Sequence, residues 1–237
     1  RIAEARHFGL AVDGVRNQTM LHPEGRNQLL EIFSLAREYG FSWEFANGLE
    51  FGKLITNDVL DYELLDCLFW NKKSESEWLG CYRVQIPLEC LKDDPGKKFS
   101  KLIDYDRQLE ILTAILSYGV TYQTYNVIIG FPEDDERSLA KYVQRCHHIR
   151  DRLAAHDSGY LPYFNIFNLT LLPGTVDYRR MKHMLAFDID EHPEVIGVYL
   201  SALNTDHFYY YQIFNERVKM ARELNGDMIE VYDKIFH

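Results

Sequence analysis

The chain has 237 residues, of which 46% are hydrophobic and 26% are charged, a composition that excludes disordered, collagen-like and coiled-coil proteins. Its formal net charge is −10 and its pI is near 5.4, so its field repels phosphate polymers and disfavours nucleic acid as a partner. No apolar run approaches the roughly 18 residues of a membrane span. The first residues carry neither Met nor a secretory signal, and we expect a chain that begins partway through a longer protein.

Five strands are predicted along the chain, with helical stretches between them. The strands are expected at 7–13, 41–45, 81–86, 120–129 and 160–167. Helical spacing is clearest around Leu29–Ala36 and Leu109–Leu116, with Pro23 and Asp104 as the expected start signals.

A glycine recurs about every forty residues at the expected end of a helix and the start of a strand. The glycines are Gly40, Gly80, Gly119 and Gly159. One strand and one helix per period predict a parallel α/β sheet, either open or closed toward a barrel, and the period alone does not choose between them. No Gly-rich phosphate loop of the Rossmann or P-loop kind is present.

Polar residues follow the expected carboxyl ends of these strands, where parallel α/β proteins place their chemistry. They are Asp13, Asn47, Glu89, Asn126 with Glu133, Asn165 and Asn168. Glu133 also precedes a predicted helix, and we favour a capping role for it.

The cysteines and histidines give no metal-binding pattern. Cys67, Cys81, Cys90 and Cys146 are spaced too widely for a zinc knuckle or a disulfide scaffold, and each is predicted to be a small buried hydrophobe. Free thiols in a chain of this size indicate a reducing compartment, and we expect the cytoplasm. No histidine pair has ligand spacing, so no metal ligand is assigned.

Four segments in the same order resemble the core domain of the radical S-adenosylmethionine (SAM) superfamily, in its MiaB/NifB-like branch. The segment from Tyr125 through Ile-Gly-Phe-Pro-Glu is similar to the family's fifth strand and turn, and Leu172-Pro-Gly-Thr to the end of its sixth strand. Val84-Gln-Ile-Pro-Leu-Glu is similar to the fourth strand, although Pro87 and Leu88 replace small residues. Trp43-Glu-Phe-Ala-Asn-Gly-Leu resembles the third strand of the subset that often carries a cobalamin-binding domain upstream.

This resemblance implies a partial parallel (β/α)6-type TIM-like barrel at residues 1–180 that lacks its first strand, followed by a helical extension at 181–237. It further implies that the barrel binds SAM. Asp13 would pair with the ammonium group, Asn47 would hold the carboxylate or ribose, and Glu89 would accept hydrogen bonds from the ribose. The fifth strand and its turn would face the adenine, with Gly130 permitting close approach. The residues expected at the cofactor are Asp13, Asn47, Glu89, Asn126, Ile128, Gly130 and Leu172.

Family members bind a [4Fe–4S] cluster through Cys-x-x-x-Cys-x-x-Cys and form a 5′-deoxyadenosyl radical from SAM, but that motif is absent from this sequence. We expect the cluster ligands to precede Arg1, so that this chain alone is inactive while its parent is an enzyme. The substrate, a small molecule or a protein, stays open, as does the use of cobalamin. Two alternatives remain: a non-catalytic barrel that serves as a scaffold, and an unrelated barrel enzyme with Asp13 and Glu89 as acid and base.

The segment from Phe208 to Arg222 resembles the helical tail that follows such barrels. Its apolar spacing predicts a buried stripe on one helix face. The stripe would comprise Phe208, Tyr211, Ile213, Phe214, Val218 and Ala221.

Overall fold

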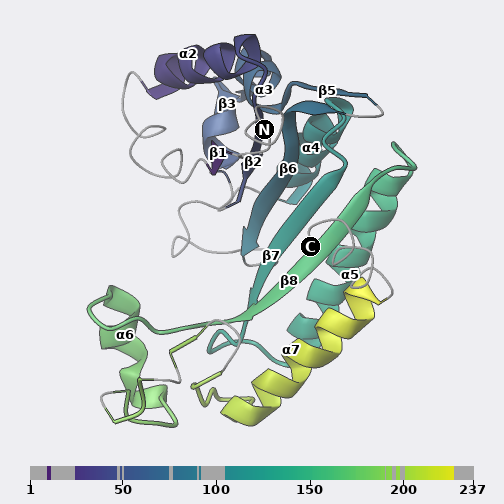
Figure 1. Cartoon of the computed structure of the whole chain (residues 1–237). Helices are drawn as coiled ribbons and strands as arrows, with labels where there is room; N and C mark the ends of the chain where they lie inside the picture. Colours follow the sequence, from purple (N-terminus) through teal and green to yellow (C-terminus); the bar gives the residue numbers. More distant parts are fainter. Residues whose placement is uncertain are drawn as a thin grey trace. The chain divides into compact units, whose positions relative to one another are not determined.

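A computed structural model describes residues 10–11, 25–46, 49, 51–74, 77–89, 91, 105–189, 191–193, 196–197 and 201–226 (Figure 1). Its strands are β1 (Leu10–Ala11), β2 (Ser42–Phe45), β3 (Ile55–Thr56), β4 (Val59–Leu60), β5 (Asn71–Lys73), β6 (Trp78–Glu89), β7 (Tyr122–Ile129) and β8 (Leu161–Asn168). Its helices are α2 (Gly25–Glu38), α3 (Tyr62–Phe69), α4 (Tyr105–Ser117), α5 (Glu136–Ala154), α6 (Val176–Met181) and α7 (Tyr210–Asn225), with short 3-10 turns at Phe51–Leu54 and Lys182–Met184. Pro23, Asp104, Asp13, Asn47 and Cys90 lie outside the described residues.

The main sheet is mostly parallel, which confirms the predicted α/β class. Its strands follow the order β1-β2-β6-β7-β8, and β1, β2 and β6 pair in parallel. Leu161 donates its N–H to the carbonyl of Thr121, and Leu169 donates to Ile129, so β7 and β8 advance in the same direction. Within the described residues, the order runs from β1 to β8 without a pairing that closes the sheet into a barrel.

Each predicted strand overlaps an observed one, and the structure adds two hairpins that the period did not predict. β3 and β4 pair through a turn at Asn57 and Asp58, whose φ values of 53° and 63° are those of a two-residue hairpin turn. β5 pairs antiparallel with β6 and lies between α3 and β6 in the chain.

Gly80, the second of the four recurring glycines, does not end a helix as expected. It lies inside β6 rather than at a helix end, and its φ is +84°. A Cβ there would stand 2.2 Å from the carbonyl oxygen of Trp70, because β5 enters its pairing at this point. Gly80 is therefore required by the close approach of two backbones. Gly159 also differs, since its φ is not positive.

The chain forms two compact units, and β6, β7 and β8 each contribute residues to both. The first contains residues 1–87, 93–125 and 149–162, and the second contains 88–92, 126–148 and 163–237. The predicted domain boundary near residue 180 stays a prediction.

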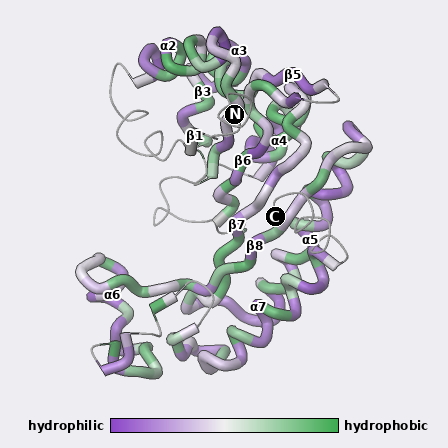
Figure 2. The backbone as a smooth tube through the Cα atoms, viewed as in Figure 1, coloured by the Kyte–Doolittle hydropathy of each residue, from purple (hydrophilic) through white to green (hydrophobic). Residues whose placement is uncertain are grey.

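The core of the first unit is aromatic. α2 buries Leu29, Phe33 and Ala36, and its hydrophobic and hydrophilic residues alternate along the helix (Figure 2). The Phe33 ring packs 5.2 Å from Trp43 and 5.5 Å from Phe45, measured between ring centroids. These contacts join α2 to β2 and bury both strand aromatics almost completely.

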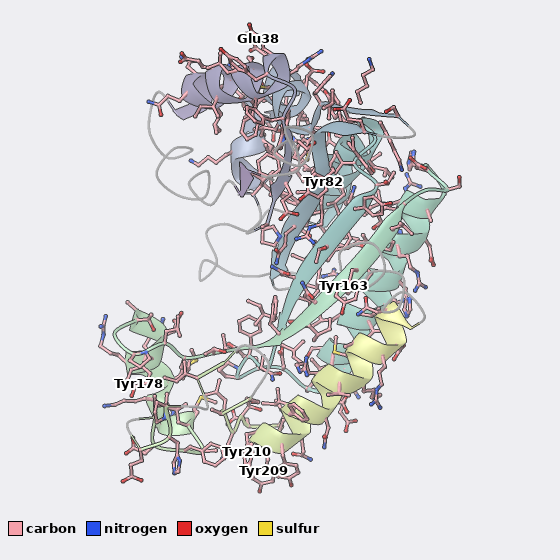
Figure 3. The ribbon with its side chains drawn as sticks, in the orientation of Figure 1. Glu38, Tyr82, Tyr163, Tyr178, Tyr209 and Tyr210 are labelled. Atoms are coloured by element: carbon pink, nitrogen blue, oxygen red, sulfur yellow. The ribbon has the colours of Figure 1, made fainter. Side chains whose placement is uncertain are left out.

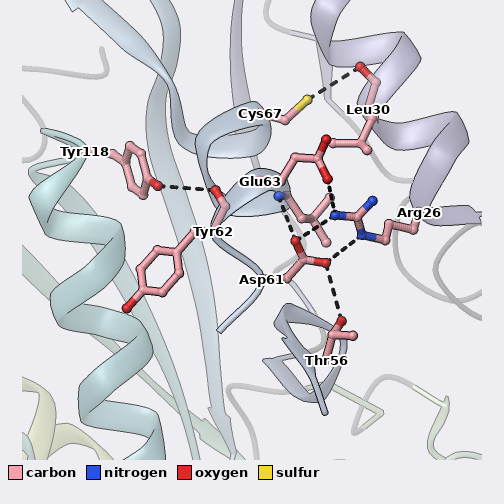
Figure 4. Close-up of polar contacts among 9 residues, drawn as sticks. Arg26, Leu30, Thr56, Asp61, Tyr62, Glu63, Cys67 and Tyr118 are labelled. Atoms are coloured by element: carbon pink, nitrogen blue, oxygen red, sulfur yellow. Dashed lines mark hydrogen bonds and ion pairs between the residues drawn. The ribbon is translucent and has the colours of Figure 1, made fainter. Parts of the chain in front are cut away.

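A partly buried ion pair ties α2 to α3 in the same unit (Figure 4). Arg26 donates from Nε and Nη2 to the two carboxylate oxygens of Asp61, at 2.6 and 2.8 Å. Asp61 is also the N-cap of α3 and accepts from the backbone N–H of Leu64. The Arg26 guanidinium is the main cause of a lowered Asp61 pKa. One carboxylate thus caps a helix and fixes a helix pair.

In the second unit, α7 exists as predicted but presents a different face. Its buried residues include Ile213, Met220 and Leu224, whereas Tyr211 and Phe214 are exposed. The predicted stripe was therefore right at Phe208 and Ile213 and wrong at Tyr211 and Phe214, because the helix turns Ile213 inward and these two aromatic side chains outward. Val218 and Ala221 are half-buried. Among the described residues, no helix has the length and apolarity that crossing a bilayer requires.

Candidate functional site

In the second unit, the carboxyl-terminal halves of β7 and β8 present two unlike faces. Val127 and Ile129 are buried on one face of β7, as Phe164 and Ile166 are on β8. The alternate residues are half-buried, and they are Asn126, Ile128, Tyr163, Asn165 and Phe167 (Figure 3 labels Tyr163). One face of these strands therefore packs in the core, while the other is polar and aromatic and partly accessible.

Two amides meet on this half-buried face. Asn165 Nδ2 donates to Asn126 Oδ1 at 3.2 Å, which links β7 to β8 through their side chains. Asn126 was an expected cofactor residue, and Asn165 belonged to the wider set of strand-end polar residues. The structure brings these two together.

The turn after β7 is built around a buried carboxylate that the sequence did not single out. Asp134 is fully buried, and its Oδ2 accepts the backbone N–H groups of Gly130 (2.8 Å) and Phe131 (3.0 Å). Its Oδ1 accepts the Tyr142 hydroxyl at 3.2 Å. Asp134 therefore fixes the end of β7 to the helix that follows.

The predicted capping role of Glu133 was wrong. α5 begins at Glu136, and Asp135 accepts the backbone N–H of Ser138 at 2.8 Å, as an N-cap residue does. Glu133 is exposed, two residues too early in the chain to reach the first turn. The backbone hydrogen bond from Ser138 is the main cause of a lowered pKa for Asp135.

Gly130 has the expected conformational freedom, and the structure shows what fills the space beside it. Its φ is +86°, and a Cβ would stand 3.0 Å from Ile213 Cγ2 on α7. The missing side chain thus permits helix packing, and any contact of Gly130 with a cofactor would be made by its backbone.

Asn168 and Leu172, two other residues predicted near strand ends, lie away from the Asn126–Asn165 pair. Asn168 is only 2% exposed and lies on the buried face of β8, and neither of its side-chain amide atoms has a hydrogen-bond partner. Leu172, an expected cofactor residue, lies beyond β8 and is 53% exposed. Neither therefore belongs to the face that carries Asn126 and Asn165.

In the first unit, the half-buried face of the sheet carries charge. Arg83 Nε lies 2.9 Å from Glu44 Oε2, joining β6 to β2. Burial and the neighbouring Glu44 carboxylate raise the pKa of Tyr82. Nothing in the sequence indicated this pair beyond the place of each residue on a predicted strand. Glu89 is the last residue of β6, and Asp13 and Asn47 lie outside the described residues.

The described cysteines do not fit an iron–sulfur cluster. Cys67 lies on α3, Cys81 on β6 and Cys146 on α5, and none of these three forms a disulfide. Burial raises the pKa of both Cys67 and Cys81, which opposes the thiolate form that ligates iron. In the part of the chain that the structure describes, no three His, Cys, Asp or Glu side chains gather as a metal site would require.

A scan against models of protein families gave no match, and a search of curated proteins found no relative of this chain.

Proposed function

We propose that this chain is the SAM-binding part of a radical SAM enzyme core. The observation that carries the proposal is the Asn126–Asn165 amide pair on adjacent parallel strands, followed directly by the Gly130 turn. The carboxyl ends of parallel strands are where α/β proteins bind nucleotides and other ligands. The sequence resemblance supplies the identity of the ligand.

In this proposal, the amide pair binds an uncharged polar edge of SAM, since amides both donate and accept. Ile128 lies two residues after Asn126 on the same half-buried face and offers an apolar surface to the adenine. Glu89 holds the ribose, and Asp13 and Asn47 hold the methionyl end. Leu172 would reach the cofactor only from the segment beyond β8.

The proposal includes a partial (β/α)6-type barrel whose first strand, cluster loop and [4Fe–4S] ligands belong to other parts of a longer cytoplasmic protein. The bound cluster would supply the one electron that cleaves the C5′–S bond of SAM, which gives methionine and a 5′-deoxyadenosyl radical. Because Cys67, Cys81 and Cys146 do not fit that cluster, no step of the reaction is assigned to them. An upstream cobalamin-binding domain is a further prediction of the resemblance.

Calorimetric titration of the purified chain with SAM tests the proposal. We expect saturable binding that weakens by about tenfold or more in Asn126→Leu and Asn165→Leu, because each leaves a polar ligand edge unpaired. Asn215→Leu, at an exposed position of α7, is the matched control and should bind as the wild type does. Circular dichroism confirms that each variant is folded.

The alternatives give different results in the same experiment. A scaffold that lost its cofactor would fold and take up no SAM in any form. An acid and base enzyme built on Asp13 and Glu89 would act without SAM and lose activity in Glu89→Gln, with a pH profile to match. Either result would contradict the proposal.

A further inference from the structure

A groove runs between α5 and α7 in the second unit, where the two helices lie side by side (Figure 1). It encloses about 430 Å³ and is lined from α5 by Glu136, Leu139, Ala140 and Val143, and from α7 by Glu216, Lys219, Met220 and Glu223. On each helix these residues follow the spacing i, i+3, i+4, i+7. Each helix therefore gives one continuous face to the groove, about two turns long.

The groove has an apolar floor and an acidic rim. Leu139 and Met220 are buried at its base, and Val143 is half-buried beside them. Glu136, Glu216 and Glu223 supply three carboxylates, and they outnumber the one lysine of the lining, Lys219, which lies 3.3 Å from Glu216. The net charge of the lining is therefore negative.

A side-chain contact also joins the two helices beside the groove. His147 lies one turn beyond Val143 on α5, and its Nε2 is 3.6 Å from Glu223 Oε1. The His147 Nδ1 atom is buried and has no hydrogen-bond partner. The carboxylates of Glu216 and Glu223 are seven residues apart, which places them about 10 Å apart along the helix axis.

We propose that this groove binds a short amphipathic helix of a partner protein, with an apolar side chain on the floor and two lysine or arginine residues beside Glu216 and Glu223. Charge complementarity selects this occupant, because basic side chains seven residues apart on a helix match the spacing of the two carboxylates. Apolar anchors at helical spacing in a groove between helices are a common mode of peptide recognition. The volume admits several side chains, as is usual for sites that bind by inserted anchors.

A fluorescently labelled helical peptide with Lys at positions i and i+7 and Leu at i+3 and i+4 tests this proposal by anisotropy. The same peptide with Glu in place of both Lys residues is the ligand control. We expect the basic peptide to bind the intact chain and the acidic peptide to give no saturable signal. Absence of binding by the basic peptide would overturn the proposal.

Variants of the chain distinguish the groove from the general acidity of the protein. Ala140→Arg fills the groove and adds a positive charge, while Ala154→Arg makes the same substitution at an exposed position at the far end of α5, outside the lining. We expect Ala140→Arg and the double variant E216Q/E223Q each to weaken binding about tenfold or more. Ala154→Arg and the charge-matched double variant D177N/E191Q should bind as the wild type does.

Equal weakening by D177N/E191Q would show that the peptide senses only the net charge, which overturns the proposal. A homodimer seen by light scattering and lost in Ala140→Arg would assign the groove to a second copy of the chain and would also overturn it. SAM binding is measured on each variant as well. Because Asn126 and Asn165 do not line the groove, a failure to bind the peptide and a failure to bind SAM are separate results.

Discussion

The side-chain amide of Asn225, at the end of α7, pairs with both backbone groups of Phe164 in β8. Asn225 Oδ1 accepts the Phe164 N–H at 2.8 Å, and its Nδ2 donates to the Phe164 carbonyl at 2.9 Å. β8 is an end strand of the described sheet, so these two groups have no strand to pair with on that side. One buried amide thus takes the place of a neighbouring strand.

Replacing this amide tests its contribution to stability. Asn225→Ala leaves a buried N–H and a buried carbonyl unsatisfied, and we expect the free energy of unfolding to fall by about 2–4 kcal/mol. Urea unfolding followed by circular dichroism measures the change. Asn215→Ala, at an exposed position of the same helix, should change stability by less than about 0.5 kcal/mol. Equal effects of the two variants would show that the pairing contributes nothing.

Gly130 and Gly174 form a matched pair for testing the packing of α7. Both have φ of +86°, but a Cβ at Gly174 would meet nothing within 4 Å, whereas one at Gly130 would stand 3.0 Å from Ile213. Gly174→Ala should cost about 1–2 kcal/mol, the cost of a left-handed conformation. Gly130→Ala should cost about 1–3 kcal/mol more, from overpacking. Identical melting midpoints for the two variants would contradict the contact with Ile213.

The sequence predicted the parallel sheet because its signal is periodic and local. A glycine and a strand recur every forty residues, and hydrophobic spacing indicated α2 and α4 within a few residues of their observed bounds. β5 and the β3–β4 hairpin escaped prediction because strands of two or three residues carry too little pattern. Gly80 resembled a helix-end glycine, while its reason for being glycine lies in the distant carbonyl of Trp70.

The candidate site was likewise predicted from the sequence only in part. Asn126 was predicted from its place near a strand end, but its pairing with Asn165 depends on the register of β7 against β8. Glu133 attracted the capping prediction because it follows Pro132, yet three more acidic residues, Asp134, Asp135 and Glu136, follow it. The first residue of α5 decides which carboxylate caps the helix and which one is buried. Local sequence patterns predict helix boundaries poorly.

Two neighbouring carboxylates after β7 should therefore behave differently when they are removed. Asp134→Ala deprives three buried donors of their acceptor, and we expect a loss of about 2–4 kcal/mol in unfolding free energy. Glu133→Ala removes an exposed side chain and should be close to neutral. Chemical unfolding of both variants decides the question. A larger loss in Glu133→Ala would restore the original capping assignment.

The Arg26–Asp61 pair predicts a specific pH dependence. The pKa of Asp61 is lowered in the folded chain, so its pairing adds stability above the unfolded-state pKa of about 3.9, and this stability is lost as the pH falls through the lowered value. Asp61→Asn keeps an oxygen to cap α3 but loses the charge. Because Arg26 is 38% exposed, solvent screening limits the expected difference from the wild type to about 1 kcal/mol at neutral pH.

Unfolding by urea at pH 7, 5 and 3 measures this difference. We expect the wild type and Asp61→Asn to differ at pH 7 and 5 and to converge at lower pH. Glu63→Gln is the control, since Glu63 also contacts Arg26 but is 71% exposed, and it should change stability little at any pH. A difference that grows as the pH falls would contradict the assigned direction of the pKa.

The central claim, that the half-buried face of β7 and β8 binds SAM, is tested most directly at the side-chain amides. Asparagine labelled with ¹⁵N reports each amide group in a nuclear magnetic resonance titration of the chain with SAM. We predict that the signals of Asn126 and Asn165 shift together and saturate, while those of Asn225, already paired with Phe164, and of exposed Asn215 stay in place. Unchanged Asn126 and Asn165 signals at saturating SAM would contradict the claim.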